Sequence, residues 1–326
     1  MCTAATLTTK DHYFGRNLDL EYSYSETVTV APRKFPFHFR HVEDLTEHYA
    51  LIGMAYVAGG FPLFYDATNE KGLSIAGLNF PQNAHFLPCK NEEGVDDIAS
   101  FELIPWLLGQ CATVAEARKL LARLNVCDDN FAEQLPANPL HWMLDDGTEC
   151  VVIEPLAAGV RVYDNPVGVM TNNHTFDMQM MHLADYMGVN AGQGVNRFAP
   201  NVPLDCYSRG MGSLGLPGGL DSASRFVKVA FTKLNSVSAD DESSSVSQFL
   251  HVLGSVCQQR GCCDLGDGKY EITIYSSCCN ATKGIYYYTT YDNPQVSGVD
   301  MHHEDLDGTE LAMYPLVEQQ TFNMQN

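Results

Sequence analysis

The sequence predicts an α+β fold in which antiparallel sheets stack on one another and helices flank them. Short β-like runs are frequent, helical periodicity comes in blocks, and strands and helices do not alternate strictly. The chain has 326 residues, of which 45 % are hydrophobic and 18 % charged, so it can bury a sizeable core. We therefore expect a single domain over residues 1–326.

The predicted strands are short runs of β-branched and apolar residues bounded by turn-forming residues. They cover Cys2–Thr9, Ser25–Ala31, Leu51–Val57, Leu63–Ala67, Gly72–Asn79, His141–Asp145, Cys150–Pro155, Val160–Tyr163, Gly168–Asn172, Glu271–Ser277, Gly284–Tyr291 and Val296–Met301.

Five segments show helical periodicity, and they fall in the middle and late parts of the chain. They are Ser100–Gln110, Val114–Leu124, Phe176–Met187, Ser222–Leu234 and Ser245–Cys257. The polar run Ser236–Ser247 is interpreted as a surface connection. The glycine-rich stretch Gly210–Asp221 is interpreted as a long loop, either an ordinary surface loop or one close to a functional site.

The charge of the chain excludes several classes of partner. Its formal net charge is −21, from 19 Lys and Arg against 40 Asp and Glu, so nucleic acid and anionic membranes are not expected to bind. No stretch approaches the roughly 20 apolar residues of a membrane helix. The first residues lack the basic and apolar regions of a signal peptide, which predicts a cytoplasmic protein.

Cysteine and histidine spacing does not predict a metal site. The eleven cysteines are expected to be free thiols in a reducing compartment. The pairs Cys262–Cys263 and Cys278–Cys279 lack the spacing of zinc ligands, and adjacent cysteines on a strand point to opposite faces. His41 with His48, and His302 with His303, show no nearby third ligand and are interpreted as surface residues.

Cys2 is the residue with the most distinctive chemistry. Removal of Met1 would give it a free α-amine, so that one residue carries both a nucleophile and a base. Moving the thiol proton to the amine costs only about 1 kcal/mol, because their ordinary pKa values are close. The alternative is a buried, inert cysteine in a first strand, and position alone favours it.

Arg16 and Asp19 supply a possible electrostatic setting for Cys2. If Tyr13–Arg16 pairs beside the first strand through a turn at Lys10–His12, Arg16 comes close to Cys2 and favours its thiolate. Asp19 could then orient the amine or Arg16. The alternative is a surface Arg–Asp pair worth less than about 1 kcal/mol.

An ordered series of motifs resembles the choloylglycine hydrolase family of N-terminal nucleophile hydrolases, and within it the bile salt hydrolases. The series runs nearly from end to end, and its order and spacing carry the resemblance. The motifs are Met1–Thr3, Phe14–Asp19, Asn69–Leu73, Ala76–Pro81, Leu140–Trp142, Thr171–Asn173, Gly215–Gly218, Ser224–Phe226, Gly284–Tyr288 and Thr290–Tyr291.

The resemblance implies a four-layer αββα sandwich with two antiparallel sheets, commonly assembled as a homotetramer. It makes Cys2 the nucleophile, with Arg16 and Asp19 holding its thiolate and amine. Asn79 and Asn172 become oxyanion donors, and Arg225 completes the polar network. Each asparagine could equally serve only a turn or strand end. Arg225, in the first turn after an N-cap at Asp221 or Ser222, opposes the helix dipole, or it could simply pair with Asp221.

The implied reaction is hydrolysis of bile acids conjugated to glycine or taurine, without metal or organic cofactor. The steroid needs a broad apolar pocket, for which the candidates are Leu18, Tyr22, Tyr24, Phe61, Tyr65, Phe131 and Leu135. The alternative for each of them is simple packing in the core. Two alternatives stay open. A penicillin V acylase would use the same chemistry, but those relatives tend to carry tyrosine in place of Asn79. A non-catalytic bile-acid-binding relative would be expected to have lost at least one catalytic residue.

Overall fold

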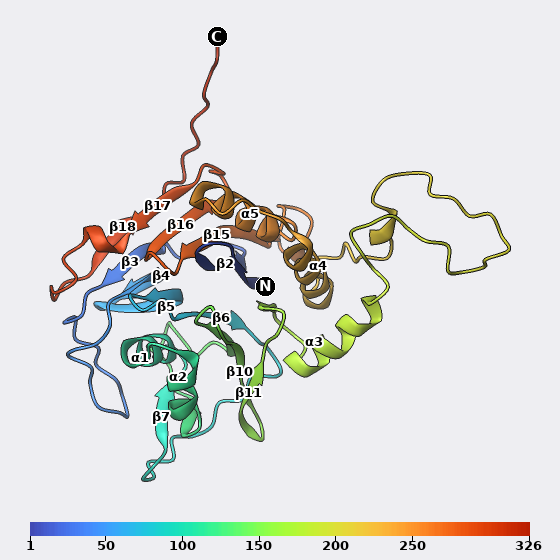
Figure 1. The fold of residues 1–326 in the computed structure, drawn as a ribbon. Helices are drawn as coiled ribbons and strands as arrows, with labels where there is room; N and C mark the ends of the chain where they lie inside the picture. Colours follow the sequence, from blue (N-terminus) through green and yellow to red (C-terminus); the bar gives the residue numbers. More distant parts are fainter.

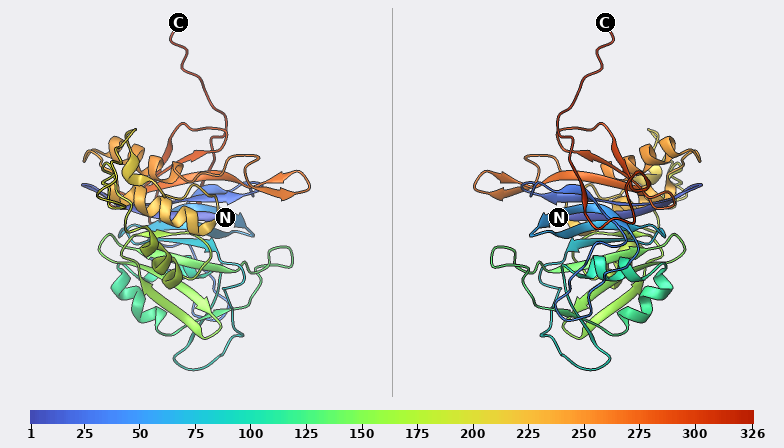
Figure 2. Two further views of the ribbon diagram at one scale, coloured as in Figure 1. Left: turned by 90° about the vertical axis from the view of Figure 1, so that its right-hand side faces the viewer. Right: turned by 90° about the vertical axis from the view of Figure 1, so that its left-hand side faces the viewer.

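Two antiparallel sheets stacked face to face form the centre of the molecule, and helices cover the outer face of each sheet (Figures 1 and 2). The computed structural model describes residues 1–326. Helices α4 and α5 lie on one sheet, and α1 and α2 lie below the other, which gives four layers (Figure 1). None of the helices combines the length and apolar character that a membrane crossing requires.

The first sheet has six strands and contains the beginning of the chain. In spatial order they are β12 (Val169–Met170), β1 (Cys2–Thr8), β2 (His12–Leu20), β15 (Ile272–Asn280), β16 (Ile285–Thr290) and β17 (Ser297–Asp300). Residues Cys2 and Leu18 lie opposite one another in the β1–β2 pair. The β2–β15 pair brings a late part of the chain beside the N-terminal hairpin.

The second sheet has eight strands and faces the first. In spatial order they are β11 (Gly159–Asp164), β10 (Cys150–Leu156), β9 (Leu140–Asp145), β6 (Ser74–Asn79), β5 (Phe61–Asn69), β4 (Leu51–Ala58), β3 (Thr27–Ala31) and β18 (Ala312–Pro315). Two small sheets accompany them: β7 (Asp96–Ala99) with β8 (Leu124–Cys127), and β13 (Asp264–Gly266) with β14 (Lys269–Tyr270).

The helices are α1 (Leu103–Gln110), α2 (Val114–Leu121), α3 (Phe176–Leu183), α4 (Ser222–Asn235) and α5 (Glu242–Gly254). Short 3₁₀ turns cover Ala184–Tyr186, Met211–Ser213 and Met301–His303. Between α3 and α4 a long segment projects from the body of the molecule, and the C-terminal tail extends in a different direction (Figure 1).

All twelve predicted strands and all five predicted helices exist, but several bounds differ. The polar run Ser236–Ser247 is not wholly a connection, because α5 begins at Glu242. Asp241 caps this helix by accepting a hydrogen bond from the Ser244 backbone N–H at 2.9 Å. The helix predicted over Val114–Leu124 ends at Leu121, and Leu124 instead begins β8, whose parallel pairing with β7 buries it.

Two apolar cores separate the layers. One core contains Cys2, Phe14 and Leu18 from the first sheet together with Met54 and Leu78 from the second. The other lies between the second sheet and α1 and α2. The start of β1 therefore lies at the boundary of the two sheets, where the N-terminus is drawn near the centre of the molecule (Figure 1).

Candidate active site

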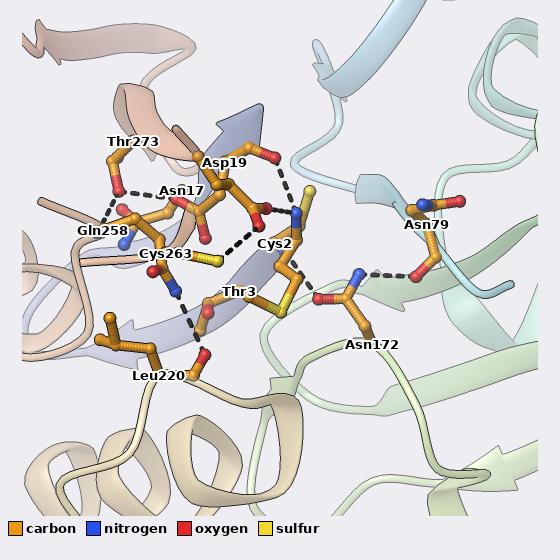
Figure 3. A network of polar contacts seen from close by, with 12 residues as sticks. Cys2, Thr3, Asn17, Asp19, Asn79, Asn172, Leu220, Gln258, Cys263 and Thr273 are labelled. Atoms are coloured by element: carbon orange, nitrogen blue, oxygen red, sulfur yellow. Dashed lines mark hydrogen bonds and ion pairs between the residues drawn. The ribbon is translucent and has the colours of Figure 1, made fainter. Parts of the chain in front are cut away.

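Cys2 is the first residue of β1 and is buried, with 3 % of its surface exposed. Its backbone N–H donates to Asn172 Oδ1 at 2.7 Å. Figure 3 shows Cys2 between Asn172 and the group formed by Asp19, Asn17 and Thr273. Cys2 thus belongs to the apolar core between the sheets, but polar partners hold its backbone on both sides, through its N–H and its carbonyl.

Met1 precedes Cys2 and holds its own amine against two acceptors. The Met1 ammonium donates to the Asp19 backbone carbonyl at 2.8 Å and forms an ion pair with the buried Glu271 carboxylate. Met1 is partly exposed. A cut after this residue would leave the Cys2 nitrogen as the chain's amine, at the place where it now bonds Asn172.

Arg16 is fully buried between the two sheets. Its Nη1 donates to the backbone carbonyls of Tyr65 at 3.0 Å and Gly77 at 2.6 Å, both on the second sheet. Burial lowers the pKa of Arg16, but the negative charges of Cys2, Tyr275 and Asp66 outweigh it and raise that pKa. One guanidinium is therefore within electrostatic reach of the Cys2 sulfur.

The alternative of a surface Arg16–Asp19 pair is wrong. Both residues are buried, and residues three apart on one strand point to opposite faces. Asp19 faces the helical side, where its Oδ1 accepts from Thr273 Oγ1 at 2.6 Å while Oδ2 is buried without a hydrogen-bond partner. Burial raises the pKa of the Asp19 carboxyl, although Arg225 and the chain's amino group oppose the rise.

Asn172 links four parts of the site. Its Oδ1 accepts from the Cys2 N–H and from Arg225 Nη2 at 2.8 Å, and its Nδ2 donates to the Asn79 backbone carbonyl at 2.6 Å. Asn79 ends β6, and its own side-chain amide is exposed and turned away from Cys2 (Figure 3). The structure thus brings Asn172 to Cys2 but presents only the backbone of Asn79 on that side.

Arg225 reaches Cys2 from the first turn of α4. Asp221 is the N-cap, as predicted, and accepts from the Ser224 N–H at 3.0 Å. The Arg225 guanidinium does not pair with Asp221. It donates to the Cys2 carbonyl and to Thr3 Oγ1, each at 2.6 Å. Burial lowers the pKa of Arg225, opposed by Asp19 and Cys2.

The candidate pocket residues fall into two aromatic groups and one residue beside Cys2. Leu18 is buried opposite Cys2. Tyr22 and Tyr24 are partly exposed and joined through their hydroxyls at 3.0 Å. Phe61 packs on Phe131, with ring centroids 6.0 Å apart. Tyr65 packs beside the core that holds Cys2, and Leu135 closes the turn that carries Phe131.

Several polar residues of the site were missed by the sequence analysis. Thr3, Glu271 and Thr273 contact Arg225, Met1 and Asp19 respectively. Behind Arg16, the buried Asp66 accepts from the hydroxyls of Tyr275 and Tyr286, each at 2.7 Å. Thr3 could have been found from its place next to Cys2. The others lie on distant strands, and their roles depend on the β2–β15 pairing and the stacking of the sheets.

The end of the Gly210–Asp221 loop also contacts this site, because the Leu220 carbonyl accepts from Arg225 Nε at 2.9 Å.

Cys278 and Cys279 are buried in β15. His41 is exposed, as predicted, but folding brings Cys89 and Asp129 to it, so it does have nearby ligand partners. The interpretation of His48 as a surface residue is wrong, because it is buried and both ring nitrogens contact backbone carbonyls.

Comparison with known proteins gives a consistent result over the whole chain. The model of the linear amide C–N hydrolases, choloylglycine hydrolase family, matches residues 2–314. The chain belongs to this family. It is 55 % identical to a bile salt hydrolase/transferase of Lactiplantibacillus plantarum over 97 % of each chain, and 37 % identical to one of Clostridium perfringens over 96 % of each.

The solved structures agree with the family. A mutant of conjugated bile acid hydrolase from Clostridium perfringens superimposes with a TM-score of 0.92 at 35 % identity over 100 % of both chains. Penicillin V acylase from Agrobacterium tumefaciens, at 18 % identity, shares the fold with a TM-score of 0.75 over 96 % of this chain and 90 % of its own. The four layers are therefore those of an N-terminal nucleophile hydrolase, and the chain is an amide hydrolase.

Proposed function

We propose that the chain hydrolyses the amide bond of glycine- or taurine-conjugated bile salts, with Cys2 as its nucleophile after loss of Met1. The observation that carries this proposal is the Cys2 nitrogen, held 2.7 Å from Asn172 Oδ1 beside two buried guanidinium groups. Six curated relatives, 31–55 % identical over nearly the whole chain, are named for bile salts or conjugated bile acids.

The proposed first step uses both functional groups of Cys2. The α-amine takes the thiol proton, the sulfur attacks the amide carbonyl carbon, and the carbonyl oxygen becomes an oxyanion. Arg16 and Arg225 stabilise the thiolate, and the Asp19 Oδ2 lone pairs, which have no partner in the protein, orient the amine. Collapse of the intermediate breaks the C–N bond, and the ammonium protonates the leaving nitrogen, which leaves a thioester on Cys2.

In the second step, water activated by the same amine attacks the thioester and releases the bile acid. We assign oxyanion stabilisation to Asn79 and Asn172. The Asn79 amide makes no hydrogen bond within the protein and points away from Cys2, so in this proposal it turns toward the substrate carbonyl when substrate binds. Such donors supply about 2.7–4 kcal/mol each in a water-excluded site. No step requires a metal or an organic cofactor.

We assign the steroid to the two aromatic groups. One is formed by Tyr22 and Tyr24, and the other by Phe61, Phe131 and Leu135, with Leu18 and Tyr65 nearer to Cys2. These residues combine apolar surface with hydroxyls, which suits an amphipathic ligand with a rigid apolar body.

The test compares amino-acid release from glycine- and taurine-conjugated bile salts with hydrolysis of penicillin V. Wild type, Cys2→Ser and Cys2→Ala are assayed side by side, with the exposed Cys206→Ser as control. We expect faster turnover of bile salts, loss of activity in Cys2→Ala, and no change in the control. Faster turnover of penicillin V would overturn the substrate assignment. Binding of bile salts without any turnover would support the non-catalytic alternative.

We also propose that the chain acts in the cytoplasm as a homotetramer. All eleven cysteines are unpaired in the structure, which suits a reducing compartment. An apolar groove between α3 and α4 is lined by residues that include Met180, Leu183, Phe231 and Leu234. Beside it projects the segment between α3 and α4, whose Phe198 is 92 % exposed. Together they offer a surface for other copies of the chain.

A further inference from the structure

Three segments meet at a group of potential metal ligands far from Cys2 in sequence. His41 Nε2 lies 2.5 Å from Asp129 Oδ2 and 3.2 Å from Cys89 Sγ, and the same sulfur lies 3.7 Å from Asp129 Oδ2. Elsewhere in the molecule, histidines form pairs with carboxylates, for example His38 with Asp44 at 2.6 Å. His41 differs from these histidines because the thiol of Cys89 also lies beside its carboxylate partner.

Hydrogen bonds that do not involve the side chains of His41, Cys89 or Asp129 hold the backbone around these three residues. Asp128 N–H donates to the Leu87 carbonyl at 3.2 Å, which fixes the start of the 128–136 segment beside the residues that lead to Cys89. The buried Asp97 accepts from the N–H groups of Lys90 and Asn91, at 3.1 and 2.7 Å, and so fixes the turn after Cys89. The three side chains therefore converge from anchored backbone.

The spacing of the donor atoms suits a small divalent ion. Zinc binds nitrogen and oxygen at about 2.0–2.2 Å and sulfur at about 2.3 Å, so its tetrahedral ligands lie roughly 3.3–3.6 Å apart. The two separations that involve Cys89 are already near these values. Only the His41–Asp129 contact must open. Imidazole, thiolate and carboxylate together are a zinc-type donor set.

The exposure and charge of the site also favour a cation. His41 and Asp129 are 27 % and 28 % exposed, so an ion could enter and keep water in a fourth position. Asp97 adds a second carboxylate behind Cys89 and Asp129. A divalent ion would balance the negative charge that a carboxylate and a thiolate accumulate at one point.

We propose that His41, Cys89 and Asp129 bind one divalent ion of the zinc class, and that this ion holds the 128–136 segment against the segment around His41. One contact already joins these segments, because Arg40 Nη2 donates to the Phe131 carbonyl at 2.8 Å. The Arg40 guanidinium also lies 5.0 Å from the ring of Phe101. Phe131 packs on Phe61 and Phe101. An effect of the ion on bile salt binding rests on the proposed function; binding of the ion does not.

Binding of the ion is measured on the full-length Cys2→Ala variant, because an N-terminal Cys2 would itself bind metal through its thiol and its amine. After treatment with chelator, in the presence of a phosphine reductant, zinc is titrated calorimetrically and Co²⁺ is added as a spectroscopic probe. We expect one ion per chain and a thiolate-to-cobalt absorption band. His41→Ala, Cys89→Ser and Asp129→Asn should each weaken binding at least tenfold, while His38→Ala and Cys206→Ser should not.

A second measurement reports on the segment and on folding together. Zinc should slow amide hydrogen exchange over residues 128–136 and raise the melting temperature in the Cys2→Ala protein, but not when Cys89→Ser is added. Absence of a saturable site, or equal affinity in Cys89→Ser, would overturn the ligand assignment. Saturable binding without slower exchange would overturn the role in holding the segment. Neither result depends on which amide the enzyme cleaves.

Discussion

At the scale of single residues, two buried guanidinium groups lie within electrostatic reach of Cys2. Arg16 approaches from between the sheets, and Arg225 approaches from α4. Buried carboxylates balance them, with Asp66 behind Arg16 and Asp19 near Arg225. A buried charge left without such a partner costs several kcal/mol. The site is thus stable only as a complete network, and removal of one member disturbs the rest.

Replacement of Asn172 by alanine should lower kcat about 10²–10³-fold, the loss seen when one oxyanion donor is removed. The variant loses the acceptor of both the Cys2 N–H and Arg225 Nη2. Steady-state kinetics on a conjugated bile salt, with circular dichroism as a check on folding, would measure the loss. Asn235→Ala, at the exposed end of α4, is the control. A wild-type kcat in Asn172→Ala would show that this residue does not act in the reaction.

Local patterns alone could predict only residues whose partners are close in sequence, whereas Asn172 and Arg225, which contact Cys2 from distant positions, were predicted only through the family resemblance. Cys2, Arg16 and Asp19 lie on adjacent strands of one hairpin, and the turn between these strands is visible in the sequence. Thr273 and Glu271 reach the same place only through the β2–β15 pairing, some 250 positions later. The orientation of Asn79 depends on Asn172, which takes its backbone carbonyl. No local pattern encodes such contacts.

At the scale of elements, the site depends on the pairing of β2 with β15, because this pairing brings Thr273 to Asp19. A methyl group on Gly15 would lie 2.1 Å from the Ser277 carbonyl oxygen, so the two strands approach too closely for any side chain. We expect Gly15→Ala to lower the free energy of unfolding by about 3 kcal/mol or more, because backbone must move.

Urea denaturation would measure this loss. Gly254→Ala is the matched control, because its added methyl group meets nothing within 4 Å and alanine favours a helix. An equal stability of Gly15→Ala and wild type would contradict the close approach of β2 and β15.

The start of α5 should make stability depend on pH. Burial raises the pKa of Glu242, but hydrogen bonds from Lys283, Asn280 and Tyr287 outweigh it and lower that pKa. Because the pKa of Glu242 is lower in the folded state, its ionised carboxylate stabilises the fold at pH values above the unfolded-state pKa of about 4.3. This stabilisation is lost as the pH falls through the folded-state pKa. Glu242→Gln should therefore cost about 1 kcal/mol or less at pH 7.

The difference between Glu242→Gln and wild type should close as the pH falls below about 4. Denaturation at a series of pH values would show this, with the exposed Glu318→Gln as control. A difference that stays constant down to pH 3 would mean that the charge of Glu242 does not contribute.

The elements that the sequence predicts well are the buried ones with clear alternation, such as β4 and β10. Most of the strands it missed have weak signals, whereas β8 is buried and overlaps the end of a predicted helix. β7 begins with two aspartates, β13 and β14 are exposed, and β18 ends in proline. These form because a neighbouring strand offers hydrogen bonds, as β3 does for β18. Whether these segments form strands depends more on their place beside a neighbouring strand than on their amino-acid composition.

At the scale of the whole molecule, two extensions leave the body, and they should differ in function. The segment between α3 and α4 carries Phe198, and the C-terminal tail carries Phe322, which are 92 % and 76 % exposed (Figure 1). If the first extension joins copies of the chain, Phe198→Asp should reduce the proposed tetramer to smaller species, while Phe322→Asp should leave it intact. Light scattering after gel filtration distinguishes the two. Tetramers in both variants would contradict the role of Phe198.

In the proposed mechanism, the fold as a whole presents one residue, Cys2, with a free amine. Mass spectrometry of the N-terminal peptide, after acid quenching during turnover of a glycine-conjugated bile salt, tests this most directly. We expect a peptide that begins at Cys2 and carries the bile acyl group on its sulfur. An active enzyme that retains Met1, or an acyl group on any other residue, would contradict the account.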